Sequence, residues 1–324
     1  MKRILISHAI VSVLIIIILM GSSCLSSSNN GGNVTPSPSV QSSPPVNVNG
    51  QGSNANGNGS KVSPAEIDNS VANADTAMIF KVDKEVLLRN KGAADFIRIL
   101  SGLFRGGDLL RVGQQAIAWV TCPDGHICPL PTGDYTDCCH VTCAEPIQLG
   151  PSGGSETRVM MRKMDLPAQE RQTVEIAELR IRQLGADDVT TQFLIANLYS
   201  SWKLTEANQE VYKLSEQLKD PAAQQKLDKL YVPMVRKTGD LYLKLDQKVS
   251  AEQSYKKAVE LAPGARDEKE EAAANVSLGQ LYEKTGQKEA AVDNLQKATV
   301  LYEKQGEVQK AMQTRRVITR VQRQ

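Results

Sequence analysis

The sequence has few of the residues from which catalytic and nucleic-acid-binding sites are built. Among its 324 residues there are three histidines, and aromatic residues make up 4%. It contains no H-E-x-x-H motif and no phosphate-cradling glycine motif. The formal net charge is only +2, so there is no basic excess to attract a nucleic acid. We therefore expect a non-catalytic protein with no cofactor and no nucleic-acid partner.

Long apolar runs are equally scarce, and the one that occurs lies at the start of the chain. Residues 4–20 are almost wholly apolar, follow a basic Met-Lys-Arg start, and are followed by small residues at 21–23. This order is typical of an export signal. We expect residues 1–23 to be that signal, and the rest of the chain to work outside the cytoplasm.

A lone cysteine, Cys24, follows the small residues. The stretch that ends there resembles the lipobox of bacterial lipoproteins, although Gly21 stands where that family commonly has Leu, Val or Ile. The resemblance implies cleavage before Cys24, a diacylglycerol on its sulfur, and anchoring in the bacterial cell envelope. Two alternatives stay open. An ordinary signal peptidase would release a soluble protein, and an uncleaved run would anchor the chain, though it is near the short limit for a span.

Residues 24–73 contain the candidate anchor cysteine and then a segment of mostly Ser, Asn, Gly, Pro, Gln and Val. Such a segment buries too little apolar surface to offset its ordering entropy. The sequence predicts a disordered linker that lets the folded domains reach away from the membrane.

Residues 74–148 read as a small β-rich domain. Strand-like runs occur in the stretches TAMIFKV, EVLLRN, DLLRVG and AIAWVTC, and the stretch CPDGHIC signals a hairpin. The intervening AADFIRILSGLF is expected to be a short helix or an irregular excursion. The succession GGDLLRVG, AIAWVTC and PDG resembles FecR-type envelope domains over residues 76–132. That resemblance implies a compact extracytoplasmic β-domain, and it does not imply a role in iron uptake.

Five cysteines lie in this domain, and none follows it. In an exported chain, disulfides are the expected state; the candidates are Cys122, Cys128, Cys138, Cys139 and Cys143. Cys122 and Cys128 flank the Asp-Gly turn and would face each other across a hairpin, which leaves Cys143 for Cys138 or Cys139. A metal site is the weaker alternative, because no C-x2-C pair occurs. Its ligands would come from Cys122, His126, Cys128, Cys138, His140 and Cys143.

After a linker at residues 149–164, residues 165–324 have a helical period. Gly239, Tyr242, Ala251, Tyr255, Ala258 and Pro263 fall in register with a 34-residue helix-turn-helix repeat, as do Leu278, Gly279, Tyr282, Ala291, Leu295 and Ala298. A weaker copy includes Ala196 and Tyr199. The pattern resembles the tetratricopeptide repeat family over residues 189–305 and implies an α-solenoid. We expect the insert KDPAAQQKLDKL to lengthen a helix, and the last helix to cap the array.

Two functional hypotheses follow. The first is a membrane-tethered, extracytoplasmic adaptor whose repeats bind a protein partner in the groove of their first helices. The resemblance places Phe193, Asn197, Arg236, Asp240, Gln280 and Glu283 on that face. The second is an envelope sensor or ligand- or metal-binding protein that acts through the cysteine-rich domain, with the repeats as a spacer.

Overall fold

The structure is a computed structural model that describes residues 76–122, 126–136, 143, 145–151 and 158–324. The predicted signal, Cys24 and the linker lie outside these residues, as do Cys138, Cys139 and His140. Among the described residues, no helix is both long and apolar enough to cross a membrane.

The β-rich part consists of two antiparallel sheets. The larger sheet has the strand order β4-β1-β6-β7-β9 and the smaller has β3-β2-β5-β8. The strands of the larger sheet are β1 (Thr76–Asp83), β4 (Gly102–Arg105), β6 (Ile117–Thr121), β7 (His126–Leu130) and β9 (Ile147–Gln148). Those of the smaller sheet are β2 (Val86–Arg89), β3 (Ile97–Arg98), β5 (Leu109–Val112) and β8 (Gly133–Tyr135).

The larger sheet is buried on both faces, which follows from the alternation of side chains along each strand. One set packs against the smaller sheet; it includes Ala77, Ile79, Phe104, Val120 and Leu130. The other set belongs to the same apolar cluster as the helices; it includes Met78, Phe80, Leu103, Ile127 and Ile147. The sheet is thus the shared layer between the β-sandwich and the helical part.

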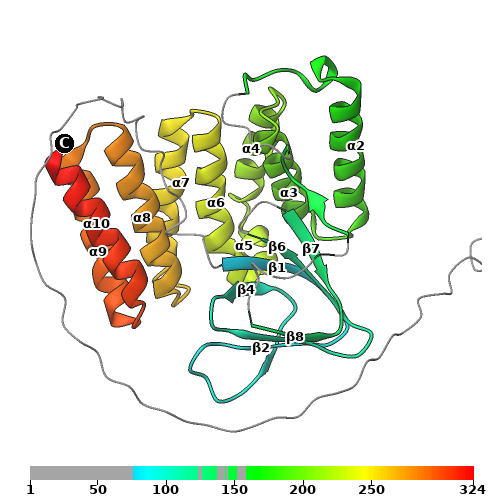
Figure 1. Ribbon diagram of the computed structural model, residues 1–324, viewed down its shortest axis with the longest axis horizontal. Coiled ribbons are helices and arrows are strands. Elements are labelled where there is room, and N and C mark those ends of the chain that lie inside the picture. The colour runs from blue at the N-terminus through cyan, green and yellow to red at the C-terminus, as the bar shows by residue number, and fades with distance from the viewer. Residues whose placement is uncertain (1–75, 123–125, 137–142, 144, 152–157) are drawn as a thin grey trace, which may run out of the picture. The chain divides into compact units, whose positions relative to one another are not determined.

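Most of the described chain after the sheets is helical (Figure 1). The helices are α2 (Ala168–Gln183), α3 (Asp188–Ser201), α4 (Ala207–Gln217), α5 (Pro221–Leu227), α6 (Tyr231–Lys244), α7 (Lys248–Leu261), α8 (Glu268–Lys284), α9 (Lys288–Lys304) and α10 (Val308–Arg323). Successive helices pack against each other, except that α4 and α5 each pack against α6. Short 3-10 turns, η1 (Lys163–Asp165) and η2 (Asp228–Leu230), precede α2 and α6. The expected fold class, a small disulfide-bearing β domain followed by a solenoid, is confirmed.

The glycine columns of the repeats are close-approach points. A Cβ added at Gly239 would lie 2.5 Å from Cε1 of Tyr255, and one at Gly279 would lie 2.6 Å from Cγ of Leu295. Both pairs join the first helix of a hairpin to the second. The hairpins α6–α7 and α8–α9 therefore close as the repeat pattern predicts.

One local expectation was wrong, and one of the two alternatives for another stretch is excluded. The insert after α4 does not lengthen a helix: Asp220 accepts a hydrogen bond from the Ala222 amide, with Pro221 at the first helical position, so a separate α5 begins there. The stretch AADFIRILSGLF forms no helix, because Ile97–Arg98 and Gly102–Arg105 are paired as β3 and β4.

Candidate functional site

The residues predicted to line the groove come from the first helices of the hairpins, α3, α6 and α8. Phe193, Arg236 and Gln280 are 3%, 1% and 2% exposed. These three side chains were predicted to line an open groove, and their burial shows that they do not. Phe193 belongs to the apolar core, and Arg236 is enclosed by carboxylates.

The other three predicted groove residues are partly exposed, and each is already bonded within the chain. Asn197 accepts a hydrogen bond from Lys244 Nζ at 3.2 Å. Asp240 accepts one from Tyr255 Oη at 2.8 Å. Both carboxylate oxygens of Glu283 accept from the guanidinium of Arg320, at 2.9 and 2.8 Å. A role for these three in partner binding stays a prediction.

A buried ionic cluster crosses this face at Arg236. Its guanidinium pairs with Glu270 of the next hairpin and with Asp240 one turn along α6. Burial alone would lower the pKa of Arg236, but the two carboxylates raise it. Burial, followed by the charge of Arg236, lowers the pKa of the neighbouring Lys237 to about 8. The cluster joins adjacent repeats and leaves little unpaired charge for a ligand.

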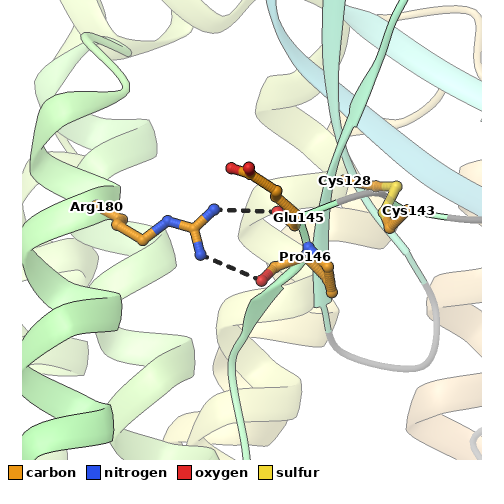
Figure 2. The surroundings of a disulfide bond; sticks show 5 residues. All are labelled: Cys128, Cys143, Glu145, Pro146 and Arg180. Carbon is orange, nitrogen blue, oxygen red and sulfur yellow. Dashed lines mark hydrogen bonds between the residues drawn. A yellow bond between two sulfur atoms is a disulfide. The ribbon is translucent and has the colours of Figure 1, made fainter. Parts of the chain in front are cut away.

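Among the described residues, three sets of hydrogen bonds attach the β-sandwich to the same helical array. Lys81 of β1 donates to the carbonyl oxygen of Leu184, at the end of α2. Arg105 of β4 donates two hydrogen bonds to Asp267, the N-cap of α8, at 3.0 and 2.8 Å. Near β9, the guanidinium of Arg180 donates to the main-chain carbonyl oxygens at 145 and 146, at 3.0 and 3.3 Å (Figure 2). The chain's own sheet therefore lies against the repeats.

Open grooves lie elsewhere, between successive second helices. One, between α4 and α7, has a volume of about 620 Å³ and is floored by Val235, Thr238 and Tyr242 of α6. The other, between α7 and α9, has a volume of about 770 Å³ and is floored by residues of α8 that include Asn275 and Tyr282.

Sequence reasoning missed both grooves, although a signal was present. The repeat pattern begins W-x2-L-G-x2-Y. Val235 and Asn275 occupy its tryptophan column. A smaller side chain at that column leaves space that an indole would fill.

The cysteine site is a disulfide between Cys128 of β7 and Cys143, with 5.7 Å between their Cα atoms (Figure 2). The suggested pairings, of Cys122 with Cys128 and of Cys143 with Cys138 or Cys139, are therefore wrong. The hairpin register places Cys128 opposite Val120, and the Cys122 amide bonds to the His126 carbonyl oxygen. Cys122 is buried.

A possible metal ligand set lies at the same place. A ring nitrogen of His126 and the sulfur atoms of Cys128 and Cys143 all lie within 4.8 Å of one another. Zinc binds the thiolate form of cysteine, so the disulfide and a metal compete for the same sulfur atoms. Of the six residues in the metal hypothesis, the described structure brings these three together.

The fold is that of a β-sandwich joined to an array of helical hairpins, and the hairpins have known relatives. The tetratricopeptide repeat family model matches residues 238–264 and 272–305, which cover the second half of α6, all of α7, most of α8 and all of α9. The chain therefore contains tetratricopeptide repeats. A solved structure, "Crystal structure of BtubC (BKLC) from P. vanneervenii", is similar at 17% identity over 48% of this chain and 72% of that chain, with a TM-score of 0.33. None of the curated proteins matches.

Proposed function

We propose that this protein is a non-catalytic scaffold that binds a protein partner through its tetratricopeptide repeats. The repeats themselves carry the proposal, since stacked helical hairpins present extended surfaces of the kind used for protein binding. The grooves between the second helices are the surfaces we assign to the partner. On the face of the first helices, the described candidate residues are buried or bonded within the chain.

The second part of the proposal concerns location. We propose export of the chain and attachment to a bacterial envelope membrane through a lipid on Cys24, with the polar segment up to residue 73 as the tether. The support is the order of basic start, apolar run, small residues and cysteine. One acyl chain alone binds a membrane only marginally, whereas the two chains of a diacylglycerol give stable anchoring.

Site-specific photo-crosslinking in cells tests the binding surface. A photoreactive phenylalanine analogue is placed at Tyr212 or Val300, which are 60% and 63% exposed beside the two grooves. The matched control is Leu100 of the β-sandwich, which is 72% exposed. The proposal expects one defined adduct from a repeat position and none from Leu100. An adduct from Leu100 alone would move the function to the cysteine-bearing domain.

The anchor is tested separately with Cys24→Ser. If the proposal is right, the variant loses incorporation of labelled fatty acid and leaves the membrane fraction. Unchanged membrane association would favour the uncleaved apolar run as the anchor. Release of the unaltered protein would favour ordinary signal cleavage.

A further inference from the structure

The groove between α7 and α9 has a polar floor. Glu271, Asn275, Leu278 and Tyr282 follow one another at helical spacing along α8 and all line it. Val259 of α7 lies on one wall. The other wall belongs to α9 and includes Asn294, Lys297 and Leu301.

Two asparagines in this groove have side-chain amides whose orientation is fixed by hydrogen bonds. The Nδ2 group of Asn275 donates to the Glu271 carbonyl oxygen at 2.9 Å, and that of Asn294 donates to the Ala290 carbonyl oxygen at 2.7 Å. A reversed amide would put two oxygens against each other, so the orientation is set by chemistry. Each side chain therefore keeps its Oδ1 atom as an acceptor.

The acceptor of Asn275 is the unusual one. Asn275 is 2% exposed, and among the described residues its Oδ1 atom has no hydrogen-bond partner. A buried acceptor without a hydrogen-bond partner destabilises the folded chain. A donor supplied from outside the chain would recover that cost.

The charges around the groove favour a cation. Lys256 is paired with Glu252 at 2.7 Å, and Lys297 is paired with Asp293 at 2.7 Å. Within the described part of the chain, the carboxylate of Glu271 takes part in no ion pair. The carboxylate of Glu271 therefore leaves a negative charge at the groove. It lies beside the acceptor oxygens of the asparagines and beside apolar side chains.

We propose that this groove takes an arginine side chain of a protein partner. A guanidinium has five donors and no acceptor, which suits Glu271 and the two asparagine oxygens. The aliphatic stem of an arginine would lie along Val259, Leu278 and Leu301. The inference rests on the proposed function, because the arginine belongs to the partner that the repeats bind.

The test uses the full chain and a defined probe. N-acetyl-arginine methylamide is titrated into isotopically labelled protein, and the side-chain amide resonances of Asn275 and Asn294 are followed. The probe control is the citrulline analogue, which has nearly the same shape and no charge. We expect saturable shifts with the arginine probe and affinity roughly tenfold weaker with citrulline, since charge-assisted hydrogen bonds are about twice as strong as neutral ones.

Glu271→Gln should lower the affinity of the protein for the arginine probe by a similar factor. The matched control is Glu289→Gln, because Glu271 and Glu289 each lie in the first turn of their helix and make the same favourable interaction with the helix dipole. Asn275→Leu should also lose the probe, and a preserved amide spectrum shows that the variant is folded. Equal affinity for arginine and citrulline, or no shift at Asn275, overturns the proposal.

The site and the proposed function can fail separately. If a partner crosslinks at Val300 and still does so in Glu271→Gln and Asn275→Leu, the scaffold function stands and the arginine site is wrong. If no partner crosslinks to the repeats, the scaffold function fails, while the probe titration still decides whether the groove recognises a guanidinium.

Discussion

Arg105, in the strand β4 that pairs with β1, is bonded to Asp267, which caps α8 and lies 162 residues further along the chain. Asp267 also accepts a hydrogen bond from the Glu270 amide at 3.1 Å, so one carboxylate serves both contacts. Glu270 in turn pairs with Arg236 of α6. A short chain of polar contacts thus runs from the β-sandwich into the ionic cluster between repeats.

Arg105→Met should reduce the free energy of unfolding by about 1–3 kcal/mol. The pair, in which Nη2 of Arg105 donates to both carboxylate oxygens, is largely shielded from solvent, and Asp267 would lose its charged partner. The measurement is chemical denaturation followed by circular dichroism. Arg111→Met is the matched control: Arg111 also donates to both oxygens of a carboxylate, that of Asp134, but both side chains are about half exposed. Equal losses in the two variants would mean that the sandwich is not held to the repeats by this contact.

The sequence predicts the repeats better than it predicts their surroundings. Gly239 and Gly279 could be placed because the repeat spacing encodes a close approach within one hairpin, which is a local property. The runs that became β1 and β2 were predicted as strands, but nothing in their alternation shows that they enter different sheets. Partner choice depends on contacts that are distant in sequence.

The site shows the same division between local and distant information. The helical register correctly places Arg236 and Gln280 on first helices, but it cannot show that they are buried. The pairing of Cys128 with Cys143 depended on hairpin register, which spacing alone did not fix. The sequence indicates the α7–α9 groove only through Asn275, which stands where the repeat pattern has tryptophan. The repeat spacing shows this replacement, and the overall composition does not.

Gly279→Ala should destabilise the protein by about 1–3 kcal/mol, because the new methyl group would overlap Leu295 and force the helices of the hairpin apart. Thermal unfolding by calorimetry measures the loss. Gly264→Ala is the control, since a Cβ there would lie 3.5 Å from its nearest neighbour, the Leu261 carbonyl oxygen. A Gly279→Ala variant as stable as Gly264→Ala would show that the hairpin can relax around the methyl group.

Glu178 should make the stability of the protein fall in acid. Burial would raise its pKa, but hydrogen bonds from Tyr199 at 2.6 Å, Arg182 at 2.8 Å and Lys163 at 3.1 Å outweigh burial and lower the pKa to about 2. The folded-state pKa is below the ordinary value of 4.5, so the contribution is present above pH 4.5 and is lost as the pH falls through about 2. After discounting for solvent screening it amounts to roughly 1–2 kcal/mol.

Glu178→Gln should therefore be less stable at neutral pH and should have a flatter stability profile between pH 4.5 and 2. Urea unfolding at a series of pH values measures both. Glu216→Gln, which removes an exposed carboxylate paired with Lys219, is the comparison. If both variants keep the slope of the parent protein, the acid sensitivity comes from other groups.

The Cys128–Cys143 disulfide should contribute about 3 kcal/mol, because it closes a loop with a sequence separation of 15 residues and restricts the unfolded chain. A thiol reductant should lower the melting temperature of the protein. The double variant Cys128→Ala/Cys143→Ala should melt at a similarly low temperature with or without reductant. A variant that still responds to reductant would show that another pair of cysteines carries the effect.

Zinc should bind this site only after reduction. In the oxidised protein both sulfur atoms are used in the disulfide, and His126 alone does not make a zinc site. Protein purified without reductant should hold far less than one zinc per chain by atomic emission, and reduction should raise the zinc content only if His126, Cys128 and Cys143 act together. His126→Ala would then abolish the gain while leaving the disulfide intact in the oxidised form. Stoichiometric zinc in the oxidised protein would mean that these cysteines are thiolate ligands and that the domain's stability comes from the metal.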